Sequence, residues 1–236
     1  MVSQIGYRGG QLEYIYYMGH ASFELMLGGR RLIIDPFFGA SIRGKQRSIP
    51  SSGSVEKIVK ADFVLVTHEH PDHFEKETVQ EIVRRTGAMV VAPRTVLSQV
   101  NVPENRKVDV RAGDKFNLYG VDIEVTQAVH PQSEYPVGYV VSSGGKRVYH
   151  AGDTYEFAKM IDIKADWALL PIGGSYTMDT LSAIKACEEM RPKYAVPIHY
   201  NTFDTINQVV SEFSTALEQS GKTKVVVMRP GESREI

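Results

Sequence analysis

The sequence has only one cysteine, Cys187, among its 236 residues. A single cysteine excludes an intrachain disulfide and a zinc site built from cysteines. No apolar run approaches the about 20 residues that a membrane-spanning helix needs, and the first ten residues lack the apolar stretch of a signal peptide. The net charge of −1 gives no overall field that would attract nucleic acid or an acidic membrane. We therefore expect a cytoplasmic protein.

Short β-rich segments fill most of the chain, and helical patterns follow them in three places. A hairpin turn is predicted at Gly28-Gly29, and helices are predicted over residues 71–85, 179–190 and 205–219. The β-rich segments form two groups, each with helices appended, which predicts two mixed sheets packed face to face with helices outside. We therefore expect an α/β protein with a four-layer αββα sandwich. Because no linker or close-period repeat is visible, we expect one domain over residues 1–236.

Residues 38–54 have the composition of a loop, with few apolar residues and three basic ones, Arg43, Lys45 and Arg47. Long loops in compact domains are often functional, so we interpret this segment as a flexible loop and a candidate lid. Cationic side chains bind phosphate and carboxylate groups, which makes the three basic residues candidates for holding an anionic substrate. The alternative is that they are solvated side chains of an exposed loop.

The segment VLVTHEHPDHF, residues 64–74, places three histidines and an aspartate directly after a predicted buried strand. Imidazole and carboxylate groups together are the ligands of zinc and related metal ions. In an extended segment, residues two apart point to the same side, so His68 and His70 can hold one ion. Asp72 and His73 follow where the chain turns, and could hold a second ion beside the first. The alternative, solvated polar residues at a helix start, is disfavoured because the segment holds three of the seven histidines in the chain.

Further candidate ligands stand at the ends of other predicted strands. His130 ends EVTQAVH, Asp153 follows the strand RVYHAG, and His199 ends YAVPIH. Each is weak evidence alone, because a histidine after a strand is often a hydrogen-bonded structural residue and Asp153 could cap a turn or helix. Together with the 64–74 segment, they predict a metal site at one edge of the sheets.

The residues THEHPDH match the H-x-H-x-D-H signature of the metallo-β-lactamase superfamily. The order along the chain fits as well, with LIIDP before the signature, then a histidine, then GDT, then a late histidine. The segment YMGHASFELMLGGRRLIIDPFFG and the short uninterrupted chain most resemble the small metal-dependent hydrolases related to ascorbate-6-phosphate lactonase.

This resemblance implies a dinuclear site and assigns its ligands. His68, His70 and His130 would bind the first ion; Asp72, His73 and His199 would bind the second; Asp153 would bridge both. Asp35, in LIIDP, would support the metal-binding loop without touching an ion. The redox di-iron members carry glutamate at the position of His70, so the resemblance disfavours an oxidoreductase.

Seven protein ligands on two ions leave open coordination positions, which are typical of catalytic sites. A hydroxide held by both ions is a nucleophile near neutral pH. We expect two divalent ions per chain, zinc ahead of manganese or iron, and hydrolysis of a small lactone or ester, including anionic or phosphorylated ones. Two alternatives stay open: a phosphodiesterase or small nuclease using the same site, and a non-catalytic metal-dependent binding protein.

Five residues carry further expectations. Asp72 and His20 are the candidate catalytic residues, and His20 would orient a ligand or protonate a leaving group. The alternative for His20 is a structural residue beneath the site whose hydrogen bonds are all made within the protein. Strand alternation turns His150 away from the Asp153 turn, which favours a supporting role. Tyr176 and Asn201 follow strand ends and are candidates for lining the substrate pocket. The resembling proteins often form homo-oligomers, so assembly of this chain is an open expectation.

Overall fold

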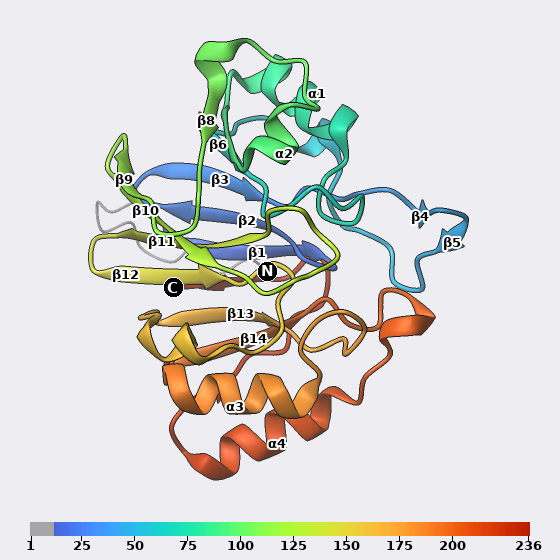
Figure 1. The fold of residues 1–236 in the computed structure, drawn as a ribbon, viewed down its shortest axis with the longest axis vertical. Coiled ribbons are helices and arrows are strands. Elements are labelled where there is room, and N and C mark those ends of the chain that lie inside the picture. Colours follow the sequence, from blue (N-terminus) through green and yellow to red (C-terminus); the bar gives the residue numbers. More distant parts are fainter. Residues whose placement is uncertain (1–11) are drawn as a thin grey trace, which may run out of the picture.

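The computed structural model describes residues 12–236, which form four layers (Figure 1). Helices α1 (Lys76–Thr86) and α2 (Arg94–Leu97) cover one outer side, and α3 (Thr180–Met190) and α4 (Val210–Ser220) cover the other. Two mixed β-sheets lie between them, so the predicted αββα sandwich is confirmed. No helix in the described part of the chain is long and apolar enough to cross a membrane.

The first sheet has seven strands in the order β16-β1-β2-β3-β6-β7-β8. Their bounds are β1 Tyr14–Gly19, β2 Ser22–Leu27, β3 Arg30–Ile34, β6 Phe63–Leu65, β7 Met89–Ala92, β8 Lys107–Asp109 and β16 Ser233–Glu235. The predicted hairpin at Gly28-Gly29 joins antiparallel β2 and β3. From β3 to β8 the strands run parallel, so their carboxyl ends meet at one edge.

The second sheet also has seven strands, in the order β15-β14-β13-β12-β11-β10-β9. Their bounds are β9 Lys115–Leu118, β10 Val121–Gln127, β11 Val137–Ser143, β12 Lys146–His150, β13 Trp167–Pro171, β14 Tyr194–Ile198 and β15 Lys224–Val225. Strands β9 to β12 are antiparallel, whereas β12 to β15 are parallel.

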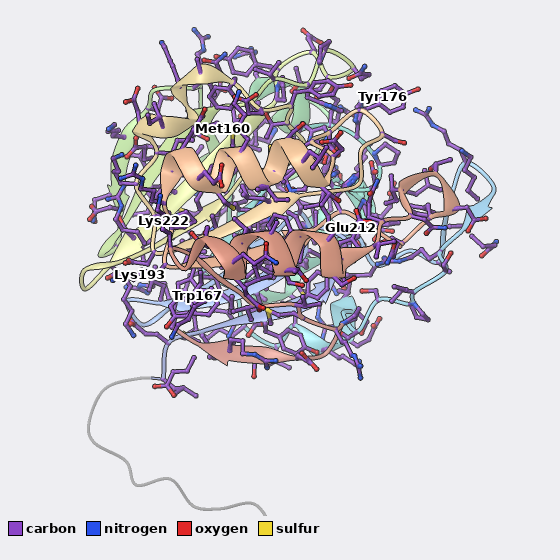
Figure 2. The ribbon with its side chains drawn as sticks, turned by 90° about the horizontal axis from the view of Figure 1, so that it is seen from below. Met160, Trp167, Tyr176, Lys193, Glu212 and Lys222 are labelled. Carbon is purple, nitrogen blue, oxygen red and sulfur yellow. The ribbon has the colours of Figure 1, made fainter. Side chains whose placement is uncertain are left out.

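Three apolar clusters hold the layers together. The largest fills the space between the sheets and includes Phe23, Phe63 and Tyr139, all fully buried. The others lie under the helices on each side, and the lone Cys187 is buried in the one beneath α3 and α4. Figure 2 shows α3 and α4 side by side, with Tyr176 toward the end where the segment of strands β4 (Ser41–Ile42) and β5 (Lys45–Gln46) projects.

Several predicted boundaries were wrong. The predicted 71–85 helix begins only at Lys76, because Pro71 belongs to a turn in which the Phe74 amide donates to the His70 carbonyl. The predicted 205–219 helix divides into the 3₁₀ turn η4 (Asp204–Ile206) and α4. Other short 3₁₀ turns are η1 Val55–Lys57, η2 Glu104–Arg106 and η3 Ala158–Asp162. The short strand β16 was not predicted.

The 38–54 segment is more ordered than the predicted flexible loop. It forms two short antiparallel strands, β4 (Ser41–Ile42) and β5 (Lys45–Gln46), which project from the body of the molecule (Figure 1). The Glu75 carboxylate accepts hydrogen bonds from the first two amides of the segment, at 2.9 and 2.7 Å. Ile42 packs against Phe37 and η4. Whether the segment acts as a lid stays a prediction.

Arg47 belongs to this anchoring and does not line the site. Its guanidinium lies over the Phe37 ring, 4.6 Å from the centroid, and donates to the carbonyls of Phe37 and Ile49 at 3.1 Å each. Burial lowers the pKa of Arg47. The prediction that Arg47 binds substrate is therefore corrected: its Nε and Nη1 donors face backbone carbonyls, and Arg47 is not among the residues that line the cavity over the candidate ligands.

Candidate metal centre

The seven predicted metal ligands lie together at one end of the sandwich. The two sheets direct their strand ends toward the same place, and the donor atoms form two groups. The first cluster consists of His68, His70, His130 and Asp153, and the second cluster consists of His20, Asp72, His73 and His199. Within each cluster one ligand atom per residue lies within 4.8 Å of every other, so each group is able to hold a metal ion.

The first cluster points three imidazole nitrogens at one another. His70 Nδ1 lies 3.1 Å from both His68 Nε2 and His130 Nε2. Ligands at zinc–nitrogen distances of about 2.0–2.1 Å around a tetrahedral ion lie about 3.3 Å apart. The spacing therefore suits a single ion between the three rings.

The outer nitrogen of each ring has an acceptor. His70 Nε2–H donates to the Gln132 carbonyl at 3.1 Å, and His130 Nδ1–H donates to the Tyr176 carbonyl at 3.0 Å. His68 Nδ1 lies 3.0 Å from the Thr67 hydroxyl. These hydrogen bonds fix the tautomers so that the inner nitrogens carry lone pairs, the arrangement found around metal-binding histidines.

Asp35 supports the second cluster from behind. Its fully buried carboxylate accepts from His73 Nδ1–H, from the Thr67 amide and from the Thr67 hydroxyl, each at 2.7 Å. His73 Nε2 consequently points inward, 3.1 Å from Asp153 Oδ1. Asp35 therefore contacts the second cluster through His73, and its supporting role at a metal site stays a prediction.

Asp153 lies between the clusters. Oδ1 is 3.1 Å from His73 Nε2 and 3.3 Å from His199 Nε2, whereas Oδ2 is 3.9 Å from His68 Nε2 and 3.8 Å from His130 Nε2. One carboxylate oxygen therefore faces each cluster, as a bridging ligand requires.

The turn before Asp153 is built around Gly152 and His150. Gly152 has a φ of +60°, and a Cβ there would lie 2.8 Å from the Thr67 side chain, so glycine is required by both conformation and space. His150 accepts from the Gly152 amide at 3.2 Å and donates to the Ala21 carbonyl at 2.8 Å. His150 thus supports this turn from behind.

His20 comes from the β1–β2 turn of the first sheet and joins the second cluster. Its buried Nε2 lies 3.4 Å from Asp72 Oδ2, and its carbonyl accepts from the His199 amide at 2.9 Å. His199 Nε2 lies 3.5 Å from the same Asp72 oxygen. His20 therefore contacts two members of its cluster.

The buried charges of the two clusters are balanced differently. Burial lowers the pKa of His68 and of His130. Burial also opposes the charged form of His73 and His199, but the nearby Asp153 carboxylate raises both pKa values above the ordinary range. Burial would raise the pKa of Asp153, but His199 and His73 hold it well below its usual range. In the metal-free protein, His73 and His199 therefore bind protons more readily than His68 and His130 do.

Strained backbone is concentrated here. His20, Asp35, Tyr176 and His199 all have positive φ angles, between 45° and 63°, although none is glycine. Such conformations are costly for side chains with a Cβ and occur most often at functional sites. Their shared location supports a functional site in this place.

A cavity of about 860 Å³ opens over the two clusters. Its wall includes Ile42, Arg43, Lys45, Gln132, Tyr155, Ser175, Tyr176, Phe203, Thr205 and Ile206. The predicted pocket residues Arg43, Lys45 and Tyr176 thus lie at the cavity. Asn201 does not, because its side chain accepts from the Gln208 amide at 2.7 Å and stabilises the η4 turn.

Two residues near the clusters were missed by sequence reasoning. Thr67 connects Asp35 with His68, and Glu69 contacts the loop after His130. Both stand inside or directly beside the H-x-H-x-D-H signature, so their positions in the sequence could have marked them as site residues. Their hydrogen-bond partners are distant in sequence and could not be predicted from it.

Comparisons with known proteins agree with this geometry. The sequence profile of the beta-lactamase superfamily domain matches residues 14–199. A UPF0173 metal-dependent hydrolase of Thermofilum pendens is 37% identical over 226 residues, covering 92% of this chain and 96% of that protein. A similar hydrolase of Staphylothermus marinus is 36% identical over 229 residues, covering 93% and 97%.

A solved structure is also similar. The metallo hydrolase Igni18 of Ignicoccus hospitalis superimposes with a TM-score of 0.82 at 34% identity, covering 96% of this chain and 99% of that one. None of these three relatives is named as an ascorbate-6-phosphate lactonase, so that closer resemblance stays a prediction. The chain belongs to the metallo-β-lactamase superfamily and is one of its small metal-dependent hydrolases.

Proposed function

We propose that this metal-dependent hydrolase holds two divalent ions and cleaves small lactones or esters, including anionic ones. The observation that carries the proposal is the position of Asp153, with one carboxylate oxygen toward each cluster. A single-ion site would need only one of these oxygens. Zinc suits the histidine-rich ligand set, and manganese or iron are the alternatives.

Unsatisfied buried atoms support the fit of metal ions. His73 Nε2, His199 Nε2 and Asp153 Oδ1 are buried without a hydrogen bond of acceptable geometry. Leaving a buried polar atom unpaired costs about 1–3 kcal/mol. The three atoms point toward one place, so one cation there would satisfy all of them.

Bound ions would supply a water molecule of lowered pKa and would polarise the carbonyl or phosphoryl oxygen of the substrate. The side chains of the protein would position these ions. The two clusters would set the distance between the ions and leave one side open to substrate, and Asp35 and Thr67 keep the inner nitrogens of the histidines directed at the site. The buried walls of Phe203 and Ile206 limit the access of water from that side of the cavity.

His20 has a positioning role in this proposal. Burial lowers the pKa of His20 to about 3, so its ring is neutral near pH 7 and lacks the extra proton of an acid catalyst. Its Nε2–H instead donates toward Asp72 Oδ2, which orients Asp72 within the second cluster.

The experiment is a hydrolysis screen on metal-free protein reloaded with zinc, manganese or iron. The substrates are aryl esters, lactones and an aryl phosphodiester, with Asp153→Asn as the inactive control. We expect ester or lactone turnover in the loaded parent and none in the metal-free protein or the variant. Faster turnover of the phosphodiester would favour the phosphodiesterase alternative. Two bound ions without any turnover would favour the binding-protein alternative.

A further inference from the structure

Glu69 is the one residue between His68 and His70, yet it does not face either cluster. Alternation in the extended segment turns its side chain to the opposite side. Its carboxylate accepts from the Ser133 hydroxyl at 2.9 Å and from the Glu134 amide at 3.0 Å. A residue inside the metal signature therefore binds a segment more than sixty positions away.

We call residues 131–136 (PQSEYP) the wall loop. It directly follows His130, and its Gln132 lines the cavity over the clusters. The Gln132 carbonyl also accepts a hydrogen bond from the outer N–H of His70. Hydrogen bonds to Glu69 and to His70 thus hold the wall loop against the signature segment.

We propose that Glu69 is a positioning residue that fixes the wall loop, and thereby keeps His70 and His130 directed at the first ion and sets the width of the cavity beside Gln132. The effect on substrate rests on the proposed function, whereas the effects on the loop and on the ion do not. Supporting residues of this kind change metal affinity or activity by about 10- to 100-fold when removed.

A carboxylate suits both partners, because the Ser133 hydroxyl and the Glu134 amide each donate to a different oxygen of Glu69. Glutamine can accept from the Glu134 amide and donate to the Ser133 hydroxyl, but these bonds lack the negative charge that strengthens the bonds of a carboxylate. We therefore expect wall-loop hydrogen exchange in Glu69→Gln to be faster than in the parent and slower than in Glu69→Ala, and we expect Ser133→Ala to lose one hydrogen bond only.

The wall loop also provides the matched control. Glu134 is an exposed acid in the same loop, and it meets Glu69 through its backbone amide rather than its side chain. The variant Glu134→Gln removes the same charge as Glu69→Gln without removing a hydrogen bond to Glu69.

The test measures three quantities. The first is amide hydrogen exchange at residues 132–135 of metal-loaded protein, because Pro131 and Pro136 have no amide hydrogen. The second is the affinity and absorption spectrum of cobalt(II) added to metal-free protein, and the third is kcat and KM of metal-loaded protein for esters of increasing leaving-group size. For Glu69→Ala we expect exchange at least about tenfold faster in the wall loop, cobalt(II) bound about 10- to 100-fold more weakly with an altered spectrum, and KM changed more than kcat. Glu134→Gln should match the parent.

Wall-loop exchange and a cobalt(II) spectrum equal to those of the parent in Glu69→Ala would overturn the proposal. If that variant does not fold, Ser133→Ala decides, because its wall loop must exchange faster than that of the parent. A parent without any turnover would refute the proposed hydrolysis alone, since exchange and cobalt(II) binding would still report on Glu69.

Discussion

Asp153 Oδ1 lies 3.1 Å from the inner nitrogen of His73, which places one carboxylate in contact with the centre of the second cluster. Its other oxygen faces the first cluster at 3.8–3.9 Å. Because the same residue serves both clusters, its loss should weaken both metal sites together rather than one.

The first prediction follows from this position. Protein purified without chelator should contain about two ions per chain, and Asp153→Ala should contain clearly fewer, because both ions lose a ligand. Elemental mass spectrometry on the parent, the variant and the exposed-site control Asp122→Asn would measure this. No bound metal in the parent, even after soaking with zinc or manganese, would contradict the assignment of the site.

The second prediction concerns Asp35. The substitution Asp35→Asn would keep the shape of the side chain, and asparagine tolerates the positive φ of 45°, but the amide cannot accept all three hydrogen bonds. For this variant we expect the free energy of unfolding of the metal-free protein to fall by about 3–5 kcal/mol, because protonated His73 loses its buried partner. Urea denaturation with and without chelator would measure the loss, and a change below about 1 kcal/mol would argue against this pairing.

The architecture and the candidate metal-binding residues were accessible from the sequence because they depend on local pattern, whereas their assignment to two ions came from the resemblance to the superfamily. Alternation places His68 and His70 on one side of the chain, and strand ends in one sheet lie at a common edge. The layer arrangement follows from β-rich groups with helices appended. These are properties of segments, so the contacts between sheets were not needed to predict them.

Features that depend on contacts between distant segments were not accessible. His20 joins the second cluster only because the β1–β2 turn of one sheet meets the end of β14 in the other. Arg47 was predicted to bind substrate because its loop carries two other cations, but its donors are used by the backbone around Phe37. Helix α1 begins later than Pro71 suggests, since residues 71–75 form the turn that directs Asp72 and His73 inward.

The third prediction concerns protons. The pKa of His73 and that of His199 are raised in the metal-free protein, so both rings hold a proton that an ion must displace. The pKa of His68 and that of His130 are lowered, so these two rings of the first cluster hold protons less readily than His73 and His199 do. Metal binding should therefore release protons at pH 7. The affinity of the second cluster for its ion should rise with pH until the pH exceeds the raised pKa values of His73 and His199. Calorimetry in buffers of different ionisation enthalpy would count the protons, and no release would contradict the sign of these shifts.

The fourth prediction separates the basic residues of the 38–54 segment. Arg43 and Lys45 line the cavity, so Arg43→Ala/Lys45→Ala should raise KM for an anionic ester by about tenfold, since exposed charge pairs contribute about 0.2–1 kcal/mol each. KM for a neutral ester of the same size should stay unchanged, and added salt should reduce the difference between the two substrates. Lys222→Ala is the matched control, because Lys222 lies at the far end of the molecule from Tyr176 (Figure 2). Arg47→Ala should instead lower the free energy of unfolding by about 1–3 kcal/mol, because its hydrogen bonds to the carbonyls of Phe37 and Ile49 and its contact with the Phe37 ring are lost. Equal effects of the double variant on both substrates would show that the two cations do not recognise charge.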